Sequence, residues 1–186
     1  MIIRRLNGDD AKAFRALRLE ALRDSPTAFG SSHDEEADRP LEWFAAELAP
    51  GAARQMFGAF IDGRLVGLVG LAPEPAVKER HRAVIRSMFV TRRARGRGVA
   101  ASLLRQALDA ADALPGVWQV ILTVTAGNES AERLYRAHGF IAYGRLPAAL
   151  HVDGRYYDDV MMIRQHPPGS IAAKRATMTP EAGDVD

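Results

Sequence analysis

The chain has 186 residues, a length that suits one domain, and its 25 basic and 23 acidic side chains leave a formal net charge of only +2. It contains no cysteine, which excludes disulfides, a thiolate nucleophile and thiolate metal ligands. The small net charge argues against a nucleic-acid-binding protein, no apolar run reaches membrane-spanning length, and the charged N-terminus is unlike a signal peptide. We therefore expect a cytoplasmic protein whose partners are neither nucleic acid nor membrane.

The N-terminal part of the sequence predicts a strand, an amphipathic helix, a polar loop, a second short helix and a β-hairpin. The hairpin is the clearest element, because two apolar runs flank Asp62-Gly63, a dipeptide that accepts positive φ in a tight turn. In chain order, these elements span residues 2–6, 8–25, 28–40, 41–48 and 54–73.

The C-terminal part predicts a strand, a helix, a strand, a helix and two final strands. Strand-helix-strand units then surround an arginine- and glycine-rich segment, which favours a mixed α/β sheet. We assign residues 1–165 to a single domain and expect residues 166–186, which lack periodicity, to form a flexible tail. The elements span residues 81–90, 99–114, 117–124, 128–138, 140–146 and 155–163.

The segment from Arg92 to Gly98 holds four arginines and two glycines and leads directly into the helix that begins near Val99. The first N–H groups of a helix have no internal partner, and the helix dipole adds positive charge there. Glycines let a ligand approach the backbone, and arginines form charge-assisted bonds with phosphate. The pattern is therefore typical of a pyrophosphate-binding turn.

Three other interpretations of this segment stay open from the residues alone. A solvated basic turn is the simplest of them. Nucleic-acid binding would need a wider basic face or aromatic stacking partners, which are absent nearby. The letters "GRGVAA" also fit the G-x-G-x-x-A pattern of dinucleotide-binding folds, but the acidic residue expected about twenty positions later is missing.

Two motifs together resemble the GNAT superfamily of N-acetyltransferases. The letters "RGRGVA", residues 95–100, match the family's Gln/Arg-x-x-Gly-x-Gly/Ala pattern between a strand and a helix. The later "NESAERLYRAHGF" supplies Asn128, Tyr135 and the pair Gly139-Phe140 in the family's order and spacing. The resemblance covers roughly residues 2–164.

This resemblance implies an α/β (α+β) GNAT fold. Its mixed, mostly antiparallel sheet would have about six to seven strands with splayed central strands, flanked by about four helices. The implied activity is direct transfer of the acetyl group of acetyl-CoA, as co-substrate and without a metal, to a primary amine of a small molecule or protein. Dimerisation is common in the family, so a homodimer is a candidate assembly.

The resemblance also assigns roles to individual residues. Tyr135 would protonate the departing CoA thiolate, and Asn128 would hydrogen-bond the pantetheine arm. From periodicity alone, Asn128 is equally a helix cap and Tyr135 a core aromatic. The other implied cofactor-binding residues are Met88, Phe89 and Val90, whose backbone would pair with pantetheine, and Arg95, Gly96, Arg97, Gly98, Val99, Ala100 and Ala101, around the pyrophosphate.

The general base is the point where this sequence departs from the family. Many relatives carry a glutamate on the strand where this chain has Arg86 and Ser87, or on the next strand where it has Thr123. The missing carboxylates leave open a second function, that of a catalytically silent acyl-CoA-binding sensor. We expect the acidic segment of residues 28–37, within the predicted polar loop, to cover the acceptor site and to receive a cationic amine. The acceptor-site candidates are His33, Glu35, Glu36 and Tyr156; further base candidates are Asp34, His81, His151 and Asp153.

Overall fold

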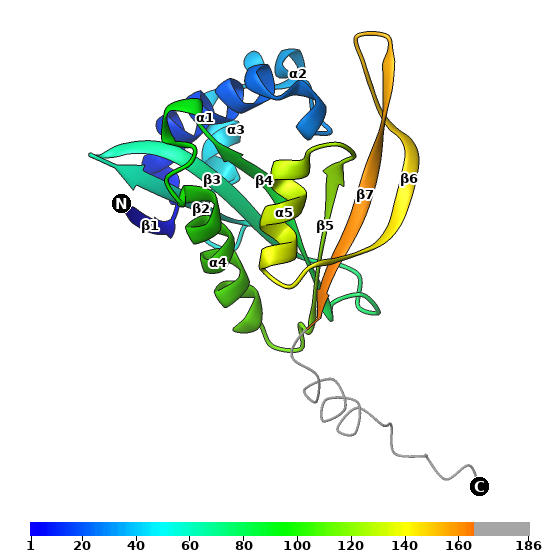
Figure 1. Cartoon of the computed structure of the whole chain (residues 1–186). Helices are drawn as coiled ribbons and strands as arrows, with labels where there is room; N and C mark the ends of the chain where they lie inside the picture. The colour runs from blue at the N-terminus through cyan, green and yellow to red at the C-terminus, as the bar shows by residue number, and fades with distance from the viewer. Residues whose placement is uncertain (166–186) are drawn as a thin grey trace, which may run out of the picture.

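A computed structural model describes residues 1–165, so the tail expected over residues 166–186 lies outside the described residues. The fold is built on a seven-stranded sheet with the order β1-β2-β3-β4-β5-β7-β6 (Figure 1). This agrees with the predicted strand number. The strands are β1 (Ile2–Arg5), β2 (Gln55–Ile61), β3 (Arg64–Pro73), β4 (Arg82–Val90), β5 (Gln119–Thr125), β6 (Ile141–Val152) and β7 (Arg155–Gln165).

The two central strands, β4 and β5, are the parallel pair in a sheet whose other neighbours are antiparallel. Their pairing is short: it joins Arg82, Ala83 and Val84 to β5 and ends at the pair Val84↔Ile121. Beyond that pair, the remaining residues of β4 and β5 are not hydrogen-bonded to each other in the described sheet. The predicted splaying of the central strands is thus confirmed.

Helices cover both faces of the sheet. Helices α1 and α3 pack over one apolar cluster, which includes Phe14, Phe44 and Met56, and α4 and α5 pack over the other, which includes Leu103 and Tyr135 (Figure 1). In residues 1–165, no helix is long and apolar enough to cross a membrane. The helices are α1 (Ala11–Asp24), α2 (His33–Ala37), α3 (Leu41–Ala46), α4 (Val99–Asp112) and α5 (Glu129–Ala137).

Helix α2 was not predicted, because its residues lie inside the segment expected to be a polar loop. Ser32 accepts a hydrogen bond from the backbone N–H of Glu35, and the Glu35 carboxylate accepts one from the N–H of Ser32. This reciprocal capping box is visible in the sequence as Ser-x-x-Glu. A helix of five residues has too few internal hydrogen bonds to stand alone, so contacts with α1 hold it in place.

The last two strands form a longer hairpin than the sequence suggested. Strand β6 continues six residues past the predicted end at 146, to Val152. Asp153 and Gly154 then form the turn with φ of 49° and 74°. The pairing of β6 with β7 is interrupted between Leu146 and Leu150, so the outer part of the hairpin is a separate ladder that periodicity alone did not connect.

Candidate active site

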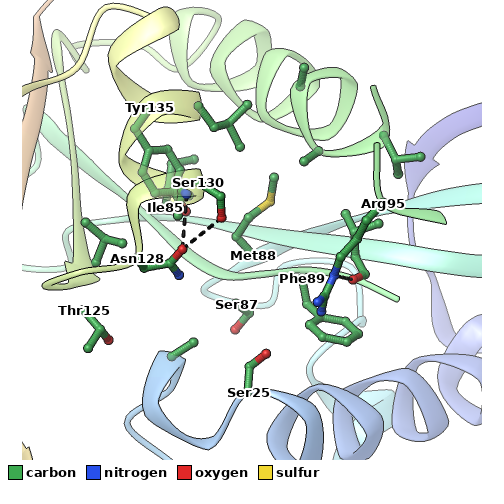
Figure 2. A pocket seen from close by; sticks show the side chains of 18 of the residues that line it. Ser25, Ile85, Ser87, Met88, Phe89, Arg95, Thr125, Asn128, Ser130 and Tyr135 are labelled. Atoms are coloured by element: carbon green, nitrogen blue, oxygen red, sulfur yellow. Dashed lines mark hydrogen bonds between the residues drawn. The ribbon is translucent and has the colours of Figure 1, made fainter. Parts of the chain in front are cut away.

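A pocket of about 570 Å³ lies where β4 and β5 separate (Figure 2). Its walls come from both strands, from the arginine- and glycine-rich loop, from the starts of α4 and α5, and from the segment that follows α1. Nearly all of the predicted cofactor-binding residues therefore line one pocket, although they come from distant parts of the sequence. Tyr135, the predicted catalytic residue, lines it too. The cofactor-binding candidates that line it are Met88, Phe89, Val90, Arg95, Gly96, Gly98, Val99, Ala100, Ala101 and Asn128, whereas Arg97 does not.

The loop before α4 is shaped by two glycines. Gly96 and Gly98 have φ of 73° and 76°, a left-handed conformation that L side chains rarely adopt. A Cβ atom on either residue would meet nothing within 4 Å, so the backbone here faces open space. The first i→i+4 bond of the helix runs from the Ser102 N–H to the Gly98 carbonyl over 3.1 Å. The amides of the first turn are consequently left without helical partners, and they form a ready anion-binding site.

Two of the four loop arginines brace this loop against the end of α1. The Arg95 guanidinium donates to the Asp24 carboxylate over 2.5 Å and to the Val90 carbonyl over 2.9 Å, and Arg92 donates to the same carboxylate. Burial alone would raise the pKa of Asp24, but the hydrogen bonds from Arg95 and Arg92 outweigh it and lower that pKa. Arg93 and Arg97 stay exposed, with no ion pair to any residue in 1–165.

A β-bulge in β4 shapes the floor of the pocket. Leu68 pairs with Phe89 and Gly70 pairs with Arg86, so β4 has one more residue than β3 between these pairs. Ser87, within the bulge, has φ of 55°. Past the bulge, the edge of β4 that faces β5 has no strand partner among the described residues. Its backbone can therefore pair with an extended ligand, as an edge strand does.

Asn128 and Tyr135 approach the pocket from α5 (Figure 2). The Asn128 side-chain oxygen accepts from the Ala131 N–H over 3.2 Å and from the Ser130 hydroxyl over 3.1 Å, so it caps the helix while also lining the pocket. Tyr135 is only 6% exposed, and its ring lies edge-to-face with Phe140. Burial raises the pKa of Tyr135 to about 12, so its hydroxyl is protonated at neutral pH.

The four acceptor-site candidates are not among the residues that line this pocket. Glu36 is buried and accepts two hydrogen bonds from Arg18, of 2.9 and 2.6 Å, while Glu35 caps α2. The His33 ring contacts the neighbouring Asp34. Tyr156 is 70% exposed on β7 and pairs with His151 of β6, next to the turn of the hairpin. The carboxylate of Glu35 thus caps α2, and that of Glu36 joins this segment to α1.

Other residues that line the pocket were not proposed as site residues from the sequence. They include Phe29, Arg86, Ser87 and Thr125. The cross-strand partner of Thr125 on β7 is Asp159. Burial raises the pKa of Asp159, and a hydrogen bond with the Thr125 hydroxyl only partly opposes this. Finding this carboxyl from the sequence would have required the β5–β7 pairing, which the sequence does not reveal.

Comparisons with known proteins agree with this geometry. The model of the Acetyltransferase (GNAT) family matches residues 16–140. A spermidine N(1)-acetyltransferase of Vibrio cholerae is 27% identical over 124 residues, which cover 67% of this chain and 70% of that protein. A GNAT-family acetyltransferase from Streptococcus pneumoniae superposes with a TM-score of 0.77 at 23% identity, covering 88% of this chain and 98% of the other. The Salmonella typhimurium protein yncA, solved with its cofactor acetyl-CoA, has a TM-score of 0.73 at 19% identity, covering 89% and 93%.

Proposed function

The chain belongs to the GNAT acetyltransferase family, and we propose that it moves the acetyl group of acetyl-CoA directly to a primary amine of an acceptor molecule. The observation that carries this proposal is the pocket between the splayed strands. It runs from an open, glycine-lined helix start to an unpaired strand edge, and a protonated tyrosine lies beside it. These features fit a long ligand that is anionic at one end and carries its reactive thioester at the other.

In this proposal, acetyl-CoA lies along the pocket. The amides from Gly96 to Ala101, with Arg95 and Arg97 nearby, bind the pyrophosphate at the positive end of α4. The backbone of Met88, Phe89 and Val90 pairs with the pantetheine arm as an added strand. The Asn128 side chain supplies a further polar contact. The acetyl-CoA-bound yncA structure supports the assignment by its shared fold.

The chemistry needs a neutral amine, an oxyanion donor and an acid for the leaving group. The amine nitrogen attacks the thioester carbonyl carbon, and the carbon–sulfur bond then breaks, so that the electron pair leaves on the CoA sulfur. A backbone N–H of β4 beside the bulge is placed to stabilise the intermediate oxyanion. The Tyr135 hydroxyl donates a hydrogen bond to the departing sulfur while negative charge builds on it, and the thiolate then takes its proton from solvent.

For the proton that the amine must lose, we propose Asp159 acting through water, because the single hydrogen of the Thr125 hydroxyl is donated to the Thr27 carbonyl. Asp159 is a half-buried carboxyl beside a pocket residue, and its raised pKa brings it closer to the range in which a general base works well. Glu35 and Glu36 are less suitable, because capping and the ion pair with Arg18 engage their carboxylates.

One observation favours a second function, a silent acyl-CoA-binding sensor. The residues that line the pocket include neither an aspartate nor a glutamate, so no carboxylate borders the reaction centre directly. A sensor would bind acetyl-CoA and leave amines unmodified.

The two functions are separated by incubating the full-length protein with acetyl-CoA and a panel of primary amines. Free CoA is detected with a thiol-reactive dye, and the chain itself gives no background because it lacks cysteine. Mass spectrometry then identifies the acetylated amine. Amine-dependent CoA release supports the transferase, whereas tight acetyl-CoA binding without release from any amine supports the sensor.

A further inference from the structure

The acceptor side of the pocket carries a positive charge that no described residue neutralises. Arg86 and Arg95 are the charged residues among those that line the pocket. Arg95 is paired with Asp24, but the exposed Arg86 guanidinium makes no hydrogen bond or ion pair with any residue in 1–165. An arginine that lines a pocket without an anionic partner is suited to bind an anion brought by a ligand.

Arg86 stands on the face of the sheet that α1 and α3 cover. Its cross-strand partner is Gly70, and paired residues share a face of the sheet. A Cβ atom on Gly70 would lie 2.9 Å from the Met56 sulfur and 3.3 Å from the Arg54 Cδ atom. Met56 is part of the cluster under α1 and α3. Arg86 therefore lies beside Ser87 and the bulge, on the side of the sheet opposite α4.

The surrounding charges leave Arg86 unbalanced. Arg18 is paired with Glu36, and Arg54 is paired with Glu47. With Arg86, this cluster has three positive and two negative groups. Burial lowers the pKa of Arg54, and the charges of Arg18 and Arg86 lower it further. Each glutamate is already paired with an arginine, so one more negative charge would neutralise the cluster.

We propose that Arg86 binds an acid group of the acceptor, so that the acetylated amine belongs to a small molecule that also carries a carboxylate, as an amino acid does. The inference rests on the proposed function and names the substrate class for the same site. A guanidinium fork holds a carboxylate through two parallel, charge-assisted hydrogen bonds. A polyamine would instead place further positive charge beside Arg86, which is unfavourable.

This assignment differs from the cationic acceptor that the acidic loop suggested. That expectation depended on free carboxylates, and Glu35 and Glu36 are not free. Arg86 cannot replace the missing base, because a guanidinium stays protonated in proteins. Arg86 can nevertheless help the chemistry. An acid group that is paired with Arg86 stabilises the ammonium of the same acceptor molecule less, so this ammonium loses its proton more easily.

The test uses pairs of acceptors in which one member carries a carboxylate and the other is the corresponding decarboxylated amine. L-lysine is compared with cadaverine and L-tyrosine with tyramine, with spermidine as a polycation. CoA release is measured at saturating acetyl-CoA for the wild type, R86Q, R86K and the control R64Q. Arg64 is an exposed arginine at the β2–β3 turn, outside the pocket lining, so R64Q removes the same charge elsewhere.

We expect the wild type to prefer the acid-bearing member of at least one pair. R86Q should raise the KM for that acceptor about tenfold to a hundredfold, which is the usual worth of charge-assisted bonds, with R86K intermediate and R64Q unchanged. Because Arg86 is exposed and unpaired, R86Q should unfold at the wild-type temperature. Calorimetric titration with acetyl-CoA should give the same Kd for the wild type and for R86Q.

Three results would overturn the inference without refuting acetyl-CoA binding at this site. One is acetylation of amines without an acid group in preference to their partners. Another is an acid-bearing acceptor whose KM does not change in R86Q. A wild type that binds acetyl-CoA but acetylates no acid-bearing amine would also count against it. Failure of the folded wild type to bind acetyl-CoA would instead refute the proposed function itself.

Discussion

Replacing Tyr135 with phenylalanine removes one hydroxyl and leaves the ring that packs under α5. The ring is 6% exposed and lies 5.9 Å from the Phe140 ring, centroid to centroid. The hydroxyl makes no hydrogen bond within residues 1–165, so its loss breaks no internal contact. We therefore expect the free energy of unfolding to change by less than about 1 kcal/mol.

The effect on catalysis follows from the pKa values of the two groups. Burial raises the pKa of Tyr135 to about 12, whereas an ordinary thiol has a pKa of roughly 8.5. In a common environment, full proton transfer from this tyrosine to a thiolate would be uphill by about 5 kcal/mol. In the proposed mechanism, the hydroxyl would therefore act mainly as a hydrogen-bond donor while charge builds on the sulfur. Loss of one such donor lowers kcat by about 10²- to 10³-fold.

The assay is CoA release at saturating acetyl-CoA and acceptor, followed from pH 6 to pH 10. The Tyr135→Phe variant should lose kcat with little change in the KM for acetyl-CoA. Because the hydroxyl titrates well above this range, the ratio of wild-type to variant kcat should be constant with pH. A kcat within about threefold of wild type, or a ratio that collapses between pH 8 and pH 10, would refute this reasoning.

Two further predictions concern stability and its pH dependence. Breaking a buried ion pair leaves an uncompensated charge, so Glu36→Gln should lower the free energy of unfolding by about 3–5 kcal/mol, measured by denaturant titration. Burial alone would raise the pKa of Glu36, but the hydrogen bonds from Arg18 lower it overall. The contribution of the Arg18–Glu36 pair to the free energy of unfolding is therefore fully present above the unfolded-state pKa of Glu36. It is lost as pH falls through the folded-state pKa. For Asp159, burial raises the pKa, so the stability that its protonated form contributes is lost as pH rises through the folded-state pKa. Asp159→Asn should therefore unfold at a higher temperature than wild type at pH 7. This advantage should disappear below pH 3. The same variant should reduce kcat, and an unchanged kcat would remove Asp159 as the proton acceptor.

The strands and the glycine-containing loop before α4 were predictable because their signals are local. Asp62 and Gly63 take the positive φ of 50° and 74° that their tight turn requires. Gly96 and Gly98 do the same before α4. In each case the backbone conformation selects the residue type within a few positions, so the sequence carries the information directly.

The contacts made by the acceptor-site candidates join distant parts of the chain, so the sequence alone does not reveal them. The composition of the acidic loop suggested free carboxylates, but whether Glu36 is free depends on Arg18, eighteen residues away on another helix. The position of Asp159 beside the pocket residue Thr125 likewise depends on the pairing of β5 with β7. Periodicity identifies which residues are buried, but it does not reveal which charges are paired.

The most direct test of the central claim is calorimetric titration of the full-length protein with acetyl-CoA, comparing wild type with Gly98→Glu and Gly116→Glu. Both glycines have positive φ, 76° and 78°, and both face open space, so the two variants add the same strain and the same negative charge. Gly98 lines the pocket at the start of α4, whereas Gly116 lies beyond the other end of that helix, outside the lining. We predict that wild type and Gly116→Glu bind acetyl-CoA and that Gly98→Glu binds at least tenfold more weakly. A folded wild type that does not bind, or a Gly98→Glu variant that binds as wild type does, would contradict the account.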